Sequence, residues 1–139
     1  MIAFDADVLT ELLAGRADFI QRAVLLSSEI QAVPVIVIEE IVRGRLNTIR
    51  WAESGKAKIG LDRAYQLFQD TVADFSRFHV QAYDSQADHL FQNWKTEKIR
   101  VGTHDMRIAA ICVSHDATLI SRNRQDFSLL PGLKVDYWQ

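Results

Sequence analysis

Apolar residues occur along this chain either in short continuous runs or at helical spacing, and the two patterns predict strands that alternate with helices. Residues 2–5 form a short apolar run that is typical of a strand, and apolar positions then recur at helical spacing from Val8 until Gly15. Residues 18–29 show helical spacing again, with an apolar face formed by Phe19, Ile20, Val24 and Leu25. We expect a strand and then two helices in this first quarter of the chain.

The second quarter predicts one more strand and two long helices. Ala32–Val37 is a β-branched run, interrupted near its start by Pro34, and predicts a strand that leads into a helix carrying two adjacent glutamates. A polar stretch with two glycines breaks the pattern between residues 51 and 60, and helical spacing resumes over Leu61–Phe78. We therefore expect two long helices joined by a turn.

The remaining elements complete an α/β pattern. We predict strands at Val80–Tyr83, Thr118–Ser121 and Lys134–Tyr137, and helices at Ser85–Thr96 and Thr103–Ser114. Alternating strands and helices favour a mostly parallel sheet of about four or five strands, with helices covering both faces in a three-layer α/β/α arrangement.

The length and composition indicate a single domain, and the net charge excludes a protein that binds nucleic acid through an overall positive charge. The 139 residues are 48% hydrophobic, which suits a single domain over residues 1–139, and the formal net charge of −2 requires any polyanion to be bound by a local patch. The single cysteine, Cys112, lies among apolar residues and is expected to be a core thiol, because one cysteine cannot form a disulfide. No apolar stretch is long enough to span a membrane, and no leader pattern is present, so we expect a cytoplasmic protein.

Four acidic residues mark the ends of apolar runs or the starts of helices: Asp5, Glu40, Asp105 and Asp126. Parallel sheets bind ligands at the carboxyl ends of their strands, so these four side chains are expected to converge there. Gathered carboxylates repel one another and need a cation, a shared proton or basic neighbours. Hard oxygen ligands favour Mg²⁺ or Mn²⁺, and the pattern therefore indicates a carboxylate metal site.

Four segments resemble the PIN-domain family, and within it the VapC-type toxins. They are Phe4-Asp5-Ala6-Asp7-Val8-Leu9, Glu40-Ile41-Val42-Arg43-Gly44, Gly102-Thr103-His104-Asp105-Met106-Arg107-Ile108-Ala109-Ala110 and Ser121-Arg122-Asn123-Arg124-Gln125-Asp126-Phe127. The resemblance runs in order from residue 2 to Trp138. It implies a PIN-like fold and a Mg²⁺- or Mn²⁺-dependent endoribonuclease, with a cognate antitoxin protein and a homodimeric state.

The resemblance also assigns the acidic positions. Asp5, Glu40 and Asp105 match the family's acids, and Asp126 matches its more variable fourth position, so all four are expected to bind metal and act in catalysis. Three departures stand out: Asp7 replaces a usual Asn, Val37 replaces a frequent Ser or Thr, and Ser121 replaces a common Thr. None of them removes a carboxylate.

Supporting residues are proposed around these acids. Asp7 is expected to be the N-cap of the first helix or to support the site from outside, and Asn123 and Ser121 are polar helpers in the segment that holds Asp126. Asp126 itself is expected in a loop. His104 lies beside Asp105 and is expected to be a surface residue, with a role as base or outer ligand as the alternative.

Basic residues flank every acidic motif, and three are our candidates to contact RNA phosphates: Arg107, Arg122 and Arg124. The others are expected to be solvated or paired with acids.

Two rival functions are open. A signalling receiver domain also gathers aspartates around Mg²⁺, but we find neither its mid-chain phosphate-accepting Asp nor its late Lys. The stronger rival keeps the PIN-like fold as an RNA- or protein-binding module without nuclease activity.

Overall fold

The structure is a computed structural model that describes all 139 residues, and its centre is a parallel sheet. The five strands are β1 (Ile2–Phe4), β2 (Gln31–Pro34), β3 (His79–Gln81), β4 (Thr118–Ser121) and β5 (Lys134–Tyr137), in the order β3-β2-β1-β4-β5. All four pairings are parallel, so every strand ends at the same edge of the sheet. The α/β class and the strand number are as predicted.

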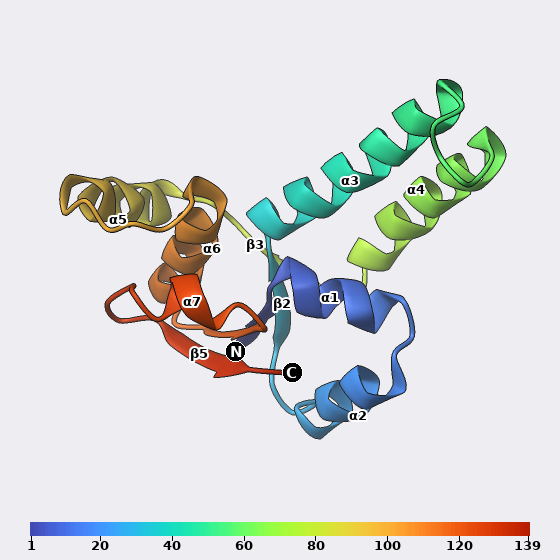
Figure 1. Ribbon diagram of the computed structural model, residues 1–139. Helices are drawn as coiled ribbons and strands as arrows, with labels where there is room; N and C mark the ends of the chain where they lie inside the picture. The colour runs from blue at the N-terminus through green and yellow to red at the C-terminus, as the bar shows by residue number, and fades with distance from the viewer.

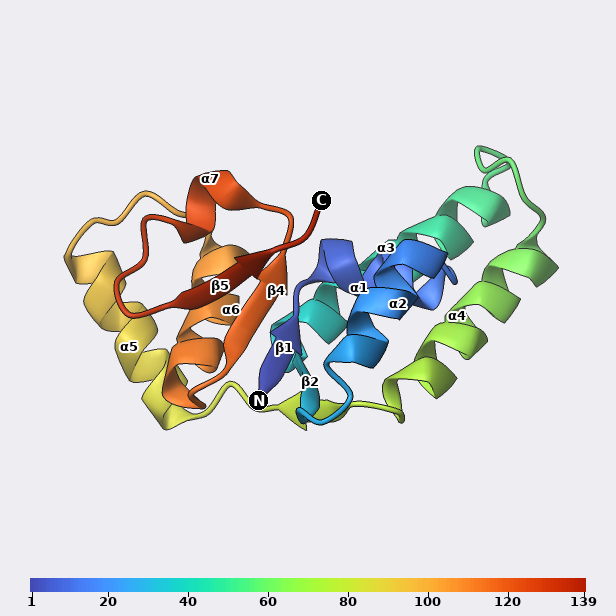
Figure 2. The same cartoon turned by 90° about the horizontal axis from the view of Figure 1, so that it is seen from below.

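Seven helices surround the sheet: α1 (Ala6–Leu13), α2 (Ala17–Leu25), α3 (Val35–Glu53), α4 (Leu61–Phe75), α5 (Ser85–Thr96), α6 (Thr103–Ser114) and α7 (Arg124–Phe127). Figures 1 and 2 show α1 and α2 on one side of the sheet and α5 and α6 on the other, while α3 and α4 form a hairpin that projects away. The order of the strands reverses at β1: the chain first adds β2 and β3 on one side of β1 and then returns to add β4 and β5 on the other side. A crevice at such a reversal is where parallel sheets bind ligands.

The core lies between β1, β4 and the two helix layers. Phe4 and Leu119 on adjacent strands are fully buried, and α6 buries nearly every side chain from Met106 to Cys112. Cys112 is the predicted core thiol, and burial raises its pKa. The single-domain prediction for residues 1–139 stays a prediction.

The predicted strand Ala32–Val37 ends three residues too late. β2 stops at Pro34, and α3 begins at Val35, so the β-branched residues Val35, Ile36 and Val37 form the first turn of a helix. Ile36 and Val37 are buried, and this apolar burial outweighs the small helix penalty of a branched side chain. The prediction of two long helices joined by a turn is confirmed by α3 and α4.

Other boundaries differ by a few residues. Helices predicted over 18–29 and 61–78 end at Leu25 and Phe75, and the strand predicted over 80–83 lies at His79–Gln81. Of the apolar face predicted for the second helix, only Phe19 enters the core, whereas Leu25 is 82% exposed. The segments Ser85–Thr96, Thr103–Ser114, Thr118–Ser121 and Lys134–Tyr137 have the predicted bounds.

Two local predictions near the acids are wrong. The N-cap of α1 is Asp5, whose carboxylate accepts a hydrogen bond from the Ala6 amide, and Asp7 lies within the first turn instead. Asp126 is not in a loop but in the short helix α7, which Asn123 precedes. Among the helices, none has both the length and the apolar character needed to cross a membrane.

Candidate functional site

Asp5 lies at the centre of the sheet edge, immediately after β1. Its side chain is 5% exposed, and its second carboxylate oxygen, Oδ2, accepts a hydrogen bond of 2.7 Å from the Ser121 hydroxyl at the end of β4. Its backbone N–H donates to the carbonyl of Ile120, which fixes Asp5 beside β4. One buried acid is therefore held by two neighbouring strand ends.

Asn123 joins Asp105 and Asp126. Its side-chain N–H₂ donates to Oδ2 of Asp105 and to Oδ2 of Asp126, each at 3.3 Å. Asp105 comes from the first turn of α6 and Asp126 from α7, so the amide brings together two acids from different elements. The Asn123 backbone N–H also donates to the Ser121 hydroxyl at 3.0 Å, which links this group to Asp5.

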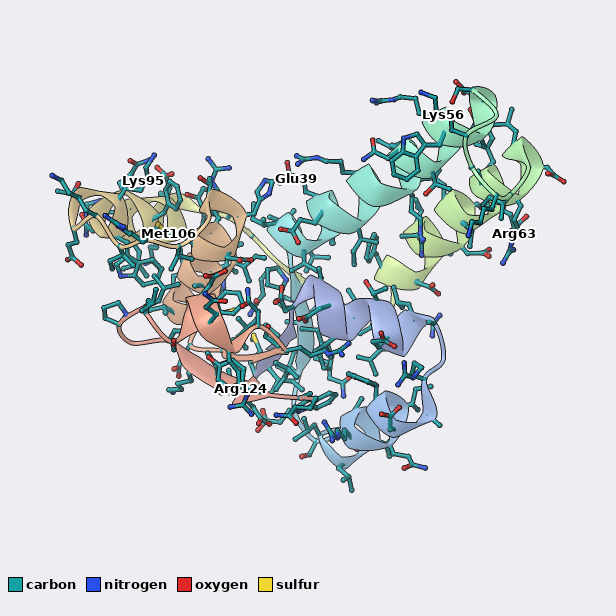
Figure 3. All side chains as sticks on the ribbon, in the orientation of Figure 1. Glu39, Lys56, Arg63, Lys95, Met106 and Arg124 are labelled. Atoms are coloured by element: carbon teal, nitrogen blue, oxygen red, sulfur yellow. The ribbon has the colours of Figure 1, made fainter.

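Glu40, and not Glu39, faces the other acids. The Glu40 side chain is 28% exposed, and Asp5 and Asp105 lie near enough to raise its pKa. Glu39 is 45% exposed and accepts a hydrogen bond of 2.9 Å from Arg43, its neighbour one turn further along α3. Figure 3 shows Glu39 at the start of α3, beside α6. This geometry favours the choice of Glu40 made from the sequence.

The carboxyl groups destabilise one another's charge. Burial raises the pKa of Asp5 to about 6, with the negative charges of Asp7 and Asp105 adding to the effect and the Ser121 hydrogen bond opposing it. Burial first, and then Asp5, Asp105 and Glu39, raise the pKa of Glu40 to about 7. The pKa of Asp105 is raised by burial and by Asp126. The site therefore holds more negative charge than its surroundings neutralise.

Asp7 connects α1 to the segment after β4. Its Oδ2 accepts a hydrogen bond of 3.1 Å from the Arg122 amide, and its Oδ1 is buried without a partner. Asp7 also lines a cavity of about 510 Å³ beside the acids, together with Ala6, Thr10, Glu11, Glu40, Ile41, Gly44, Arg45 and Arg122. These contacts suit the supporting role that the sequence suggested as an alternative to capping.

Glu11 was missed from the sequence as part of this environment, and His104 was given a role at the site only as the alternative to a surface position. Glu11 lies one helical turn after Asp7 and pairs with Arg122 at 3.5 Å, and the four-residue spacing was a signal that could have found it. His104 is half-buried, with one ring nitrogen 3.5 Å from Glu39 and the other 3.7 Å from Glu40. Its expected surface position is therefore only partly correct.

The three candidate arginines have different surroundings. The Arg107 guanidinium lies over the rings of Phe91 and Tyr83, at 5.0 and 6.0 Å from their centres, and its Nε is buried. Arg122 lies over Phe19 at 5.8 Å, and Arg124 lies over Tyr137 at 4.7 Å. Arg122 and Arg124 are exposed and follow β4 directly, which favours them over Arg107 for contact with a ligand at the sheet edge.

A divalent cation fits this donor set chemically. Asp5, Asp105 and Asp126 have no basic side chain within 4.0 Å, and Glu40 has only His104. In the arrangement seen, however, no three His, Cys, Asp or Glu side chains are close enough to form a complete ligand set. The carboxylates thus lie near one another with only His104 as a basic neighbour, which is the electrostatic condition under which a divalent cation binds.

Comparison with known proteins agrees with the fold and the order of the motifs. The sequence matches the family model described as PIN domain over residues 2–133. The chain is 28% identical to ribonuclease VapC1 of Rickettsia felis, with 71% of this chain and 89% of that protein covered.

Two solved structures share the fold over the full length of both chains. One is VapBC2 from Rickettsia felis bound to a DNA fragment from its promoter, with a TM-score of 0.78 and 20% identity. The other is DNA-bound VapBC from Salmonella typhimurium, with a TM-score of 0.76 and 20% identity. At this identity the likeness establishes the fold alone.

Proposed function

Because this chain belongs to the PIN-domain family, we propose that it is a metal-dependent endoribonuclease that hydrolyses phosphodiester bonds in RNA. One observation carries the proposal: Asp5, Glu40, Asp105 and Asp126 gather at the carboxyl edge of a parallel sheet, and the only basic side chain within 4.0 Å of any of them is His104, at 3.7 Å from Glu40. The name of the similar VapC1 protein, a ribonuclease, supports the same substrate class.

Asp5 and Asp105 would hold Mg²⁺ or Mn²⁺ directly, and Glu40 and Asp126 would complete the site or orient bound water. When bound, such a cation lowers the pKa of a coordinated water molecule and stabilises negative charge on the phosphate. All four residues belong to the candidate catalytic set.

The other residues position these acids. The Ser121 hydroxyl donates to Asp5 and so holds that carboxylate in one orientation at the strand end. The Asn123 amide holds Asp105 and Asp126 at a common point, where two free carboxylates would otherwise repel each other. Asp7 ties the Arg122 backbone to α1 and so closes the cavity wall next to Glu40.

We further propose that the protein is the toxin of a toxin–antitoxin pair in the cytoplasm, held inactive by a cognate antitoxin protein, and that it forms a homodimer. The similar solved structures are described as VapBC complexes, which supports an antitoxin partner. Exposed apolar side chains on and after α2, including Val24 at 63% and Ile30 at 57%, offer surface for a protein partner.

A cleavage assay with matched variants tests the activity. The purified chain is incubated with single-stranded RNA and Mg²⁺, Mn²⁺ or EDTA, beside Asp5→Asn and Asp105→Asn and beside Asp116→Asn as the control. Asp116 precedes β4 at the opposite edge of the sheet, and its side chain is 88% exposed. We expect cleavage by the wild type and the control with metal only, and a loss of at least 100-fold in each site variant, the order of magnitude of one essential catalytic group.

The alternative is a PIN-like module that binds RNA or protein without cutting. RNA binding by the wild type without new RNA ends at any Mg²⁺ or Mn²⁺ concentration would favour it. Full metal-dependent cleavage by both site variants would contradict the metal assignment.

A further inference from the structure

Four arginines lie over aromatic rings at the carboxyl end of the sheet, three over the Phe19–Trp138 pair and one over Tyr137. Arg16 and Arg122 lie over the Phe19 ring at 5.7 and 5.8 Å from its centre, and Arg22 lies over the Trp138 ring at 5.7 Å. The rings of Phe19 and Trp138 are themselves in contact, with centres 6.1 Å apart. Arg124 lies 4.7 Å from the centre of the Tyr137 ring. We call this group the arginine rim.

The rim is built from three distant parts of the chain and is fixed to the site by the sheet. The Trp138 amide donates to the Ser121 carbonyl at 2.9 Å, and Ser121 donates to Asp5. Tyr137 pairs with Ser121 in the register of β4 and β5. The rings that carry Arg22 and Arg124 therefore belong to the carboxyl end of β5, which only β4 separates from β1 and Asp5.

Acidic neighbours distinguish the members of the rim. Arg16 pairs with Glu11 at 3.0 Å and Asp18 at 3.7 Å, and Arg122 shares Glu11 at 3.5 Å. Arg22 and Arg124 have no carboxylate within 4.0 Å, and the nearby Asp136 accepts a hydrogen bond from the Trp138 indole instead. Their positive charge is thus the part of the rim that no protein group neutralises.

An arginine whose guanidinium lies over an aromatic ring is preorganised to bind a phosphate. The ring covers one face of the planar guanidinium and limits its motion, while the N–H groups at its edge still point outward. Two such edges can each hold a phosphate oxygen pair, and little rotamer entropy is then lost on binding. Phe19 and Trp138 are 2% and 5% exposed, so these rings serve as supports and are not surfaces on which bases can stack.

We propose that the arginine rim is the path of the RNA backbone as it leaves the carboxylate site, with Arg22 and Arg124 as the phosphate-binding side chains. This inference rests on the proposed function, and it adds Arg22 of α2, which no motif singled out. In this arrangement the RNA runs from the four carboxylates past Arg122 and across the carboxyl end of β5. The rim supplies the positive charge that the carboxylate site lacks, and a chain of net charge −2 needs such a local patch to hold RNA.

Two double variants, one in the arginine rim and one control in the α3–α4 hairpin, test the proposed path of the RNA. Arg22→Ala with Arg124→Ala removes the two unpaired rim charges. Arg50→Ala with Arg63→Ala is the matched control, because it removes two exposed charges from the α3–α4 hairpin; Figure 3 shows Arg63 and Arg124 in separate parts of the molecule. Circular dichroism confirms that each variant is folded. A fluorescein-labelled 12-nucleotide RNA is titrated in EDTA at several salt concentrations, and its cleavage is measured separately in Mg²⁺.

For the wild type and the control, we expect the same slope of log affinity against log salt. For the rim variant the slope falls by about 1.4, since each phosphate contact on a single strand contributes about 0.7. In Mg²⁺ the rim variant raises KM and leaves kcat nearly unchanged, because the rim binds the strand and does not touch the reacting bond. Arg22→Lys with Arg124→Lys keeps the charge and is expected to recover most of the slope but only part of the affinity.

An unchanged slope in the rim variant overturns the inference, and so does an equal fall in the control. If the wild type binds this RNA with the expected slope but never cleaves it, the proposed function fails while the RNA path stands. If the rim variant binds and cleaves RNA as the wild type does, the path fails while the nuclease stands.

Discussion

Replacing Asp5 by Asn should stabilise the metal-free protein while it abolishes metal-dependent cleavage. Burial raises the pKa of Asp5 from 3.8 to about 6, so the charged carboxylate is unfavourable in the folded chain. Below about pH 4 the group is protonated in both the folded and the unfolded chain and costs nothing. Between about pH 4 and pH 6 the unfolded chain releases this proton first, so the free energy of unfolding falls as the pH rises, and it levels off above about pH 6.

The magnitude follows from the difference between the two pKa values. About 2 pH units at about 1.4 kcal/mol each give an upper limit of about 3 kcal/mol at pH 8. The Asn side chain keeps the N-cap, because Asn and Asp cap helices equally well. In the variant, the side-chain amide takes the place of the carboxylate oxygen that accepts from Ser121, so it must donate to the Ser121 hydroxyl, which already accepts from the Asn123 amide. The hydroxyl hydrogen of Ser121 then loses its acceptor, at a cost of about 1 kcal/mol. The expected net gain is about 2 kcal/mol, or roughly 7 °C in the melting temperature.

Thermal unfolding of the wild type and Asp5→Asn across pH 4–8 in EDTA measures this gain. The wild type should lose stability up to about pH 6 while the variant loses less, and addition of Mg²⁺ at pH 8 should stabilise the wild type much more than the variant. Asp116→Asn serves as the control, since Asp116 lies on the opposite edge of the sheet. A variant that is less stable than the wild type at pH 8 in EDTA would refute the electrostatic reasoning, whatever its activity.

Three further predictions concern the surrounding residues. Glu40→Gln should reduce cleavage at least tenfold while Glu39→Gln, its exposed neighbour, changes it less than threefold; the reverse order in a kinetic assay would show that the wrong glutamate was chosen. Asn123→Ala should raise the Mg²⁺ concentration needed for half-maximal activity by about tenfold, because two carboxylates lose the amide that aligns them, and an unchanged metal titration would argue against that role. Gly44→Ala should stabilise the protein by about 0.5–1 kcal/mol in denaturant unfolding, since nothing lies within 4 Å of the added methyl group and helices favour Ala; a loss of stability would contradict the open position.

The sequence determined the elements from α5 to β5 with the exception of α7, which was expected to be a loop. The bounds of Thr103–Ser114 and Thr118–Ser121 agree with the prediction to the residue, because α6 has polar residues at its start and an apolar interior, and β4 begins with Thr118 and ends with Ser121 around an apolar pair. The acids at the carboxyl ends of the strands followed from the same pattern, since a parallel sheet brings those ends to one edge. The local pattern and the global fold agree in this part of the chain.

Tertiary structure decided what short-range pattern could not. Val35–Val37 reads as a strand by side-chain type, but the residues are helical because this conformation buries Ile36 and Val37 in the core. Asp5 and not Asp7 caps α1, since the chain turns directly out of β1 at that point. Hydrogen bonds of Asn123 to Asp105, 18 residues away, and of Ser121 to Asp5, 116 residues away, depend on the placement of whole elements.

The same division holds for the chemistry of the site. Residue types and order along the chain were enough to indicate a carboxylate site and the family that the chain belongs to. The raised pKa values, the pairing of Glu39 with Arg43 and the arginines over aromatic rings all depend on distances between atoms far apart in sequence. Local pattern fixes which groups are present and which strand ends carry them, and only packing fixes which of those groups meet, because charge and hydrogen bonding act through space.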